Sequence, residues 1–236
     1  MKTGRLYLIP VPLGQTPVAD VLPGPVLACA QRLVHFVAEN AKTARAFLKS
    51  LPSETPLQQI EILELNEHTA ASTLPQLLAP ALAGNDLGLI SEAGCPAVAD
   101  PGAALVALAH QRGVQVVPMI GPSSILLALM ASGLSGQSFA FHGYLPSGPQ
   151  ELGTRLRELE RESRQQQRTQ IFIETPYRNR QMLAALVQTC APSTRVCVAT
   201  DLTLDEEQIT TRTVSEWRRQ QHPEISRRPT VFLLQA

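Results

Sequence analysis

The sequence predicts an α/β protein made of two domains, each with a sheet and covering helices. Short runs rich in valine, isoleucine and leucine alternate with longer stretches of helical periodicity, a pattern typical of α/β folds. The chain has 236 residues, of which 44% are hydrophobic and 17% charged, so it can bury a substantial core. The pattern changes after Pro118. We therefore expect an N-terminal α/β domain with a mainly parallel sheet at residues 1–118 and a C-terminal α/β domain with a mixed sheet at residues 119–236.

Apolar runs in the first half predict strands, and the segments between them predict helices. The run at residues 60–65 alternates with period two, which favours an edge strand. Because helices separate the strands, the sheet is expected to be mainly parallel. The expected strands are residues 5–11, 33–38, 60–65, 86–91 and 113–119, and the expected helices are residues 43–51, 72–83 and 103–111.

The second half has some strands with no helix between them, which indicates antiparallel pairing. A helix is expected from Ser123 or Ser124, either of which is a good N-cap, to Gly133. The helix at residues 150–167 interleaves acids with bases, which favours a solvated face over a nucleic-acid helix. The other expected elements are strands at residues 139–145, 169–175, 195–200, 207–214 and 230–235 and helices at residues 179–190 and 215–220.

Composition argues against several classes of protein. The formal net charge is zero and the pI about 7.0, whereas a protein that grips a long nucleic acid is usually more basic. No apolar run is long enough for a membrane span, and Pro10 and Pro12 interrupt any signal-peptide core, so we expect no membrane partner and a cytoplasmic location. The histidines show no metal-ligand spacing, so we expect no metal. The cysteines are scattered and are expected to be reduced structural thiols: Cys29, Cys95, Cys190 and Cys197.

Loops rich in glycine and proline follow three of the expected strands, at residues 10–15, 89–105 and 120–124. In an open α/β sheet, ligands bind at the carboxyl ends of the strands, and loops without bulky side chains let a ligand approach the backbone. The loops contain no lysine or arginine, and neither GxGxxG nor GxxxxGK[ST] occurs, so an adenosyl ligand suits them better than a triphosphate. The alternative interpretation is that each loop is an ordinary strand-to-helix turn.

Five ordered motifs extend over nearly the whole chain: LYLIPVPLG, LISEAGCPAVADPG, VVPMIGPSSILLALMASGL, FHGYLP and IFIETPYR. Together they resemble the tetrapyrrole-methylase superfamily of S-adenosylmethionine-dependent methyltransferases. The closest branch is that of the ribosomal RNA small-subunit 2′-O-methyltransferases. Longer relatives carry an extra C-terminal segment, whereas this sequence ends at Ala236.

The resemblance implies two α/β domains with a cleft for S-adenosylmethionine between them, and a homodimer. It implies that cofactor contacts come largely from the backbone. We expect the loop at Gly94 to be bare so that its main chain can touch the cofactor, and Asp100 to cap the next helix. The implied cofactor-binding residues are Pro12, Ala93, Gly94, Cys95, Val98, Ser123, Ser124, Glu174, Leu202, Pro229 and Thr230.

Four motifs depart from the pattern of the RNA branch. The asparagine after P-[IL]-G in that branch is Gln15 here, and the K-G-E of the branch is Arg227-Arg228-Pro229. The A-E-D-T-R of the branch corresponds here to residues 38–42, AENAK, where an amide replaces an acid and Lys42 replaces an arginine. Its R-E-L-T-K corresponds to residues 200–204, TDLTL, which removes two positive charges. These losses leave the methyl acceptor open. The alternatives to ribosomal RNA are a tetrapyrrole or another small molecule, or no catalysis at all in a relative that only binds the cofactor.

Methylation of a ribose hydroxyl requires a general base. The candidates for this catalytic role are Glu39, Glu92, Asp201 and Glu207. The alternative for Glu92 is an exposed turn carboxylate. Lys42 and Arg178 are the candidates for binding substrate.

Overall fold

The computed structural model describes residues 2–52 and 55–236. The chain divides into two compact units between Ser123 and Ser124, somewhat beyond the boundary expected after Pro118. Unit 1 ends at Ser123, and unit 2 begins at Ser124 and continues to Ala236. Within the described residues, no helix is both long and apolar enough to cross a membrane.

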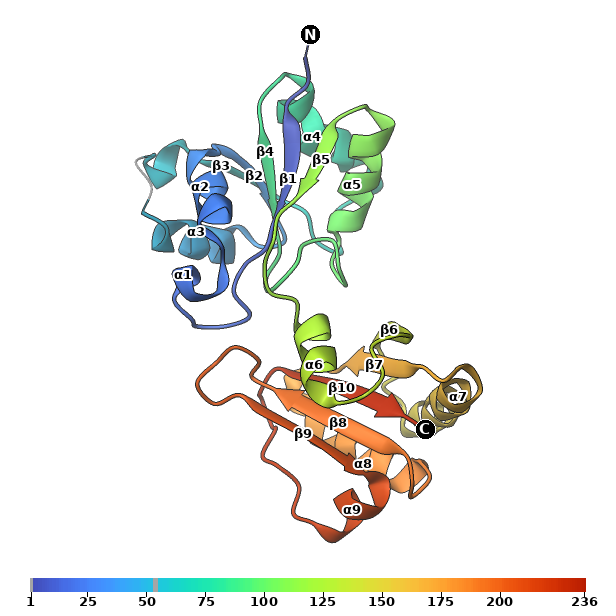
Figure 1. Cartoon of the computed structure of the whole chain (residues 1–236). Coiled ribbons are helices and arrows are strands. Elements are labelled where there is room, and N and C mark those ends of the chain that lie inside the picture. Colours follow the sequence, from blue (N-terminus) through green and yellow to red (C-terminus); the bar gives the residue numbers. More distant parts are fainter. Residues whose placement is uncertain (1, 53–54) are drawn as a thin grey trace. The chain divides into compact units, whose positions relative to one another are not determined.

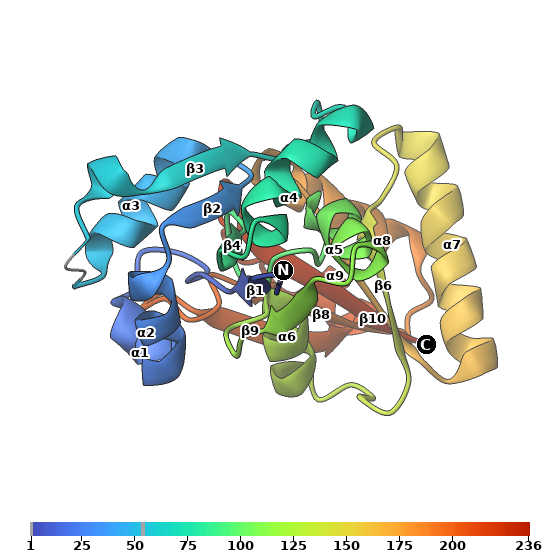
Figure 2. The ribbon, with the colours of Figure 1, turned by 90° about the horizontal axis from the view of Figure 1, so that it is seen from above.

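Unit 1 contains a five-stranded parallel sheet with the strand order β3-β2-β4-β1-β5 (Figure 1). The prediction of a mainly parallel sheet is confirmed, and β3 lies at an edge, where Figure 2 shows it beside α3. The strands are β1 (Arg5–Ile9), β2 (His35–Ala38), β3 (Glu61–Glu64), β4 (Leu87–Ile90) and β5 (Gln115–Pro118).

Helices cover both faces of this sheet. One apolar cluster joins α2 and α3 to side chains such as Phe36 and Ile90, and another joins α4 and α5 to side chains such as Leu6 and Val37. We predicted no helix between β1 and β2, yet α1 and α2 lie there. The helices of unit 1 are α1 (Val18–Val21), α2 (Gly24–Arg32), α3 (Ala41–Ser50), α4 (Leu74–Leu82) and α5 (Gly102–Gln111), with short 3-10 turns η1 (Leu57–Gln59) and η2 (Ala71–Thr73).

Unit 2 contains a mixed five-stranded sheet with the strand order β6-β7-β10-β8-β9. Only β6 and β7 pair in parallel; β10 runs antiparallel to β7 and β8, and β8 runs antiparallel to β9, which confirms the predicted mixed sheet. The strands are β6 (Phe139–Tyr144), β7 (Thr169–Ile173), β8 (Arg195–Thr200), β9 (Gln208–Thr213) and β10 (Thr230–Gln235).

The core of unit 2 lies between this sheet and α7, α8 and α9, while α6 contacts β8, β9 and β10 (Figure 1). Trp217 is fully buried, and its indole nitrogen donates a hydrogen bond to the carbonyl oxygen of Val196 at 3.0 Å. Thr213 and Glu216 form a capping box that starts α9. The helices are α6 (Ser124–Ser132), α7 (Pro149–Gln166), α8 (Asn179–Thr189) and α9 (Val214–Arg219), with one 3-10 turn, η3 (Pro176–Arg178).

Candidate cofactor and substrate site

The three predicted glycine- and proline-rich loops meet at one edge of the unit 1 sheet. They follow β1, β4 and β5, and β1 pairs in parallel with both of the others. Parallel neighbours end at the same edge of a sheet, and this is the edge where α/β proteins bind ligands. The three loops therefore surround one place in unit 1.

Hydrogen bonds join these loops to one another. The Val11 N–H donates to the Gly94 carbonyl at 3.0 Å, and the Gly94 N–H donates to the Val11 carbonyl at 3.1 Å. The Cys95 thiol donates to the Pro122 carbonyl at 3.3 Å. Since Pro12 directly follows Val11, three of the residues expected to bind cofactor lie close together: Pro12, Gly94 and Cys95.

Gly94 occupies the left-handed region, with φ +72°, where side chains are disfavoured. A Cβ atom there would lie 3.1 Å from Leu13 Cδ2 and 3.3 Å from the Pro122 carbonyl oxygen. The peptide groups of Gly94 are already bonded to Val11, so a ligand at this loop would contact the backbone of the exposed Ala93 or of Cys95 more readily.

Strained backbone continues beyond Gly94. Ala97 and Ala99 have φ values of 65° and 60°, and a left-handed conformation costs a residue with a side chain roughly 1–2 kcal/mol. Val98, between them, is 50% exposed. Such strain is concentrated at functional sites, and nothing in the residue types of this segment indicated it.

Asp100 does not cap α5, contrary to the prediction. Pro101 is the N-cap residue, and no side chain accepts a hydrogen bond there. Burial, together with a hydrogen bond to Glu39 and the charge of that residue, raises the pKa of Asp100 from 3.8 to about 7. Asp100 and Glu39 therefore form a carboxyl–carboxylate pair that holds a proton near neutral pH.

A cavity of about 280 Å³ lies beside this pair, where β2, β3 and β4 end. The Thr43 hydroxyl donates a hydrogen bond to the Glu92 carboxylate at the cavity wall. The lining is polar and has more acidic than basic character, since it consists of Glu39, Asn40, Asn66, Glu67, His68 and Glu92.

Asn40 has a structural task at the same position. Its side-chain oxygen accepts hydrogen bonds from the N–H groups of Lys42 at 2.9 Å and Thr43 at 3.4 Å, so it caps α3. Asparagine and aspartate cap helices about equally well, so the amide in AENAK preserves the cap. Lys42 is exposed and forms no ion pair with any described residue.

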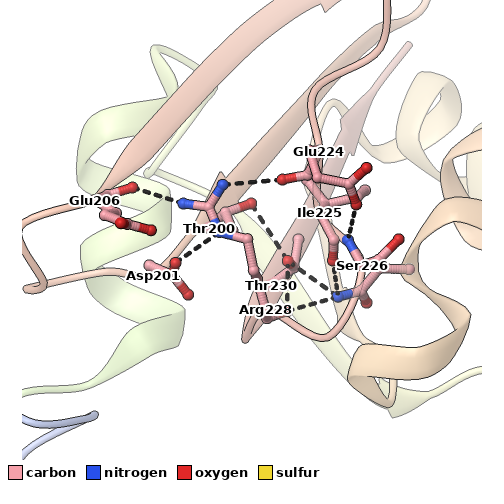
Figure 3. Close-up of polar contacts among 9 residues, drawn as sticks. Thr200, Asp201, Glu206, Glu224, Ile225, Ser226, Arg228 and Thr230 are labelled. Atoms are coloured by element: carbon pink, nitrogen blue, oxygen red, sulfur yellow. Dashed lines mark hydrogen bonds and ion pairs between the residues drawn. The ribbon is translucent and has the colours of Figure 1, made fainter.

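In unit 2, Arg228 fastens the loop after β8 to the segment before β10 (Figure 3). Its Nε donates to Asp201 Oδ2 at 2.7 Å, and its two terminal nitrogens donate to the carbonyls of Glu224 at 2.9 Å and Glu206 at 2.7 Å. The Asp201 N–H also donates to the Pro229 carbonyl at 3.0 Å. The Asp201 carboxylate is therefore held in an ion pair and is poorly suited to act as a base.

Asn179 connects the start of α8 to the same segment. It is fully buried, and its side-chain nitrogen donates to the carbonyls of Ile225 at 3.2 Å and Arg228 at 2.7 Å and to the Thr230 hydroxyl at 3.1 Å. Thr230 is also within 3.3 Å of the Thr200 hydroxyl. Three expected site residues, Asp201, Pro229 and Thr230, thus belong to one hydrogen-bonded network.

Glu174 and Arg178 are also brought together in unit 2. The Glu174 side chain is only 2% exposed, and its Oε2 lies 3.3 Å from a terminal nitrogen of Arg178. The other carboxylate oxygen accepts the Thr175 N–H at 2.7 Å, and Arg178 donates to the Ser147 carbonyl at 3.1 Å. Arg178, expected to bind substrate, is therefore already paired with a residue expected to bind cofactor.

The remaining expected residues have these positions. Ser123 ends unit 1, Ser124 begins α6 in unit 2, and Leu202 is 6% exposed. The cleft between domains stays a prediction. Within residues 2–52 and 55–236, no group of three or more histidine, cysteine, aspartate or glutamate side chains is placed to hold a metal ion.

Comparison with known proteins identifies the family. The family model described as Tetrapyrrole (Corrin/Porphyrin) Methylases matches residues 18–217. The chain belongs to the tetrapyrrole methylase family. Among curated relatives, the Ribosomal RNA small subunit methyltransferase I of Mesorhizobium japonicum is 33% identical, over 89% of this chain and 67% of its own length. The protein of the same name in Escherichia coli O157:H7 is 31% identical, over 87% of this chain and 68% of its own.

Solved structures share the fold of this tetrapyrrole methylase. The methyltransferase CobJ aligns with a TM-score of 0.64 and 19% identity, covering 99% of this chain and 94% of CobJ. A uroporphyrin-III C-methyltransferase from Thermus thermophilus, complexed with S-adenosylhomocysteine, aligns with a TM-score of 0.58 and 16% identity, covering 98% of this chain and 97% of that one. The chain is accordingly a methyltransferase, with S-adenosylmethionine as its cofactor.

The residues of unit 1 fit this cofactor. S-adenosylmethionine carries a positive sulfonium and a positive amino group, and the bare loops contain no lysine or arginine to repel them. The cavity beside the loops presents the carboxylates of Glu39, Glu67 and Glu92. These carboxylates would attract the positive groups of the cofactor, and such attraction is strongest where solvent is partly excluded.

Several residues of this tetrapyrrole methylase site were missed in the sequence. Asn66 and His68 line the cavity, Arg228 and Asn179 organise the unit 2 network, and Asp100 was assigned a different role. The helix cap formed by Asn40 was also missed, although asparagine directly before a helix is a common N-cap residue.

Proposed function

We propose that this methyltransferase methylates a ribose 2′-hydroxyl of small-subunit ribosomal RNA. The observation that carries the proposal is the cavity where β2, β3 and β4 end, because oxygen methylation needs a base and the carboxylates of Glu39 and Glu92 line this cavity. The curated relatives, which are named as ribosomal RNA small subunit methyltransferases, support the RNA acceptor.

S-adenosylmethionine supplies an activated methyl group when bound. In the proposed reaction, a carboxylate oxygen of Glu39 takes the proton of the ribose hydroxyl while the hydroxyl oxygen becomes methylated. Asp100 orients Glu39 through their shared hydrogen bond, and the Thr43 hydroxyl orients Glu92. We propose that the cofactor binds residues of the bare loops and of the second unit, which are Pro12, Ala93, Cys95, Leu202, Pro229 and Thr230.

Two substitutions distinguish the candidate bases. If Glu39 takes the proton, Glu39→Gln lowers kcat by about 100-fold or more, while Glu92→Gln has a smaller effect. The assay is transfer of a radiolabelled methyl group to small ribosomal subunits purified from cells that lack this gene. A larger loss of kcat with Glu92→Gln would assign the base to Glu92 instead.

The acceptor itself is tested with the same labelled donor. We expect label in small-subunit RNA and none in a uroporphyrinogen-type tetrapyrrole supplied as a competing acceptor. Transfer to the tetrapyrrole alone would replace the RNA proposal with small-molecule methylation. Calorimetric binding of S-adenosylmethionine without transfer to either acceptor would favour a non-catalytic relative.

We further propose that the protein is a cytoplasmic homodimer. A ribosomal RNA substrate supports a cytoplasmic location. The exposed apolar residues of α6 support self-association, since Leu126 is 50% and Met130 is 79% exposed. Light scattering after gel filtration should give the mass of a dimer for the wild type and of a monomer for Met130→Glu. A wild-type monomer would contradict this part of the proposal.

A further inference from the structure

Tyr177 is an exposed aromatic residue on a well-anchored segment of unit 2. Its side chain is 79% exposed, although an aromatic ring usually gains stability by burial. It lies in η3 between Glu174, which is buried, and Asn179, which is fully buried. The Arg178 N–H donates to the Thr175 carbonyl at 2.9 Å across the turn. The backbone below the ring is therefore held on both sides while the ring itself faces solvent.

The Arg227 guanidinium lies over one face of this ring. Its guanidinium carbon is 5.9 Å from the centroid of the Tyr177 ring. Arg227 has a left-handed backbone, with φ +62°, and its N–H donates to the Pro176 carbonyl at 3.0 Å. The buried Asn179 side chain binds the carbonyls of Ile225 and Arg228, on either side of Arg227. The position of Arg227 next to Tyr177 is thus set by the backbone.

Arg227 differs from the other arginines near it in its ion pairing. Arg178 pairs with Glu174 at 3.3 Å, Arg180 with Glu224 at 3.7 Å, and Arg228 with Asp201 at 2.7 Å, the three pairs that neutralise this region. Arg227 is exposed and forms no ion pair with an acidic residue in the part of the chain that the structure describes. Its positive charge therefore remains available to an anion from outside the protein.

We propose that Tyr177 and Arg227 form a platform that binds one unpaired nucleotide of the RNA substrate. The base stacks on the face of the Tyr177 ring opposite Arg227, and the Arg227 guanidinium contacts a phosphate of the same strand. Stacking on an exposed aromatic ring beside a cation is a usual way to bind single-stranded nucleic acid, and it tolerates any base. This inference rests on the proposed function and assigns Tyr177 and Arg227 to substrate binding.

A fluorescent RNA tests the platform directly. A short single-stranded RNA carrying 2-aminopurine loses fluorescence when its bases stack on an aromatic ring. We expect wild type to quench this probe and Tyr177→Leu to bind it about tenfold or more weakly, with the quenching lost. Tyr177→Phe should keep both binding and quenching, and Arg227→Ala should weaken binding and flatten its salt dependence.

Tyr144→Leu is the matched control, because Tyr144 is also exposed, at 62%, on β6 of the same unit. It should bind the RNA as wild type does. Calorimetry with S-adenosylmethionine should give the same affinity for every variant, and thermal unfolding should show that each one is folded.

The outcomes separate this inference from the proposed function. If wild type methylates small-subunit RNA but Tyr177→Leu binds and quenches the probe equally well, the platform is wrong and the proposed function stands. If wild type neither binds the probe nor methylates RNA, both are wrong. If Tyr144→Leu weakens binding as much as Tyr177→Leu does, the effect is not specific to the platform, and the inference is overturned.

Discussion

Replacing Asp100 with asparagine should stabilise unit 1, and more so at alkaline than at acid pH. Burial, with the contribution of Glu39, raises the pKa of Asp100 from 3.8 to about 7. The folded state therefore binds this proton more tightly than the unfolded state does. The stability that the proton contributes is complete below pH 3.8 and is lost as the pH rises through about 7. Asp100→Asn removes this loss and keeps a side-chain donor for Glu39.

The expected size follows from the same pKa values. The difference in bound protons between the folded and unfolded states is integrated from about pH 5.5 to about pH 8. The result is roughly halved because Asp100 is partly exposed, and the free energy of unfolding of unit 1 then falls by about 1 kcal/mol over this range. Asp100→Asn should thus stabilise unit 1 by about 1 kcal/mol more at the higher pH.

Hydrogen exchange of the β2 and β4 amides, measured by mass spectrometry at both pH values, reports the stability of unit 1. Fluorescence of Trp217, which is buried in unit 2, provides an internal reference that should not change. Asp20→Asn, at an exposed position of unit 1, is the matched control and should have the same small effect at both pH values. An equal effect of Asp100→Asn at the two pH values would refute the raised pKa of Asp100.

Further predictions concern the two loop regions. Asp201→Asn should destabilise unit 2 by about 2–4 kcal/mol in urea unfolding followed by Trp217 fluorescence, because Arg228 loses its partner; an effect no larger than that of the exposed Asp205→Asn would contradict this. Gly94→Ala should cost about 1–2 kcal/mol of stability and also weaken S-adenosylmethionine binding in calorimetry. Gly113→Ala is the control, because Gly113 also has a positive φ, +69°, but its Cβ would meet nothing within 4 Å. It should leave cofactor affinity intact. Equal cofactor affinities for the two variants would show that the cofactor does not bind at the Gly94 loop.

The fold was largely predictable because its signals are local. Apolar runs marked every strand of both sheets, and the alternation in residues 60–65 correctly indicated the edge position of β3. The segment with α1 and α2 was missed because Pro17, Pro23 and Pro25 resemble loop punctuation, although prolines also occur at helix starts.

The site was less predictable because its contacts join residues far apart in the sequence. Asp100 resembled a helix cap, and only the folded chain brings it to Glu39. Asp201 resembled a free carboxylate until the fold placed Arg228 beside it. Likewise, nothing local indicated that Arg227 would lie against Tyr177.

The most direct test of the proposed activity is nucleotide-resolution mapping of 2′-O-methylation in small-subunit ribosomal RNA, from cells with and without this gene. Methylation of a ribose protects the adjoining phosphodiester from alkaline cleavage, so a methylated nucleotide appears as a gap in the cleavage ladder. We expect one such gap to vanish on deletion and to return when the wild-type gene, but not Glu39→Gln, is supplied. An identical ladder from both kinds of cell would contradict ribose methylation by this protein.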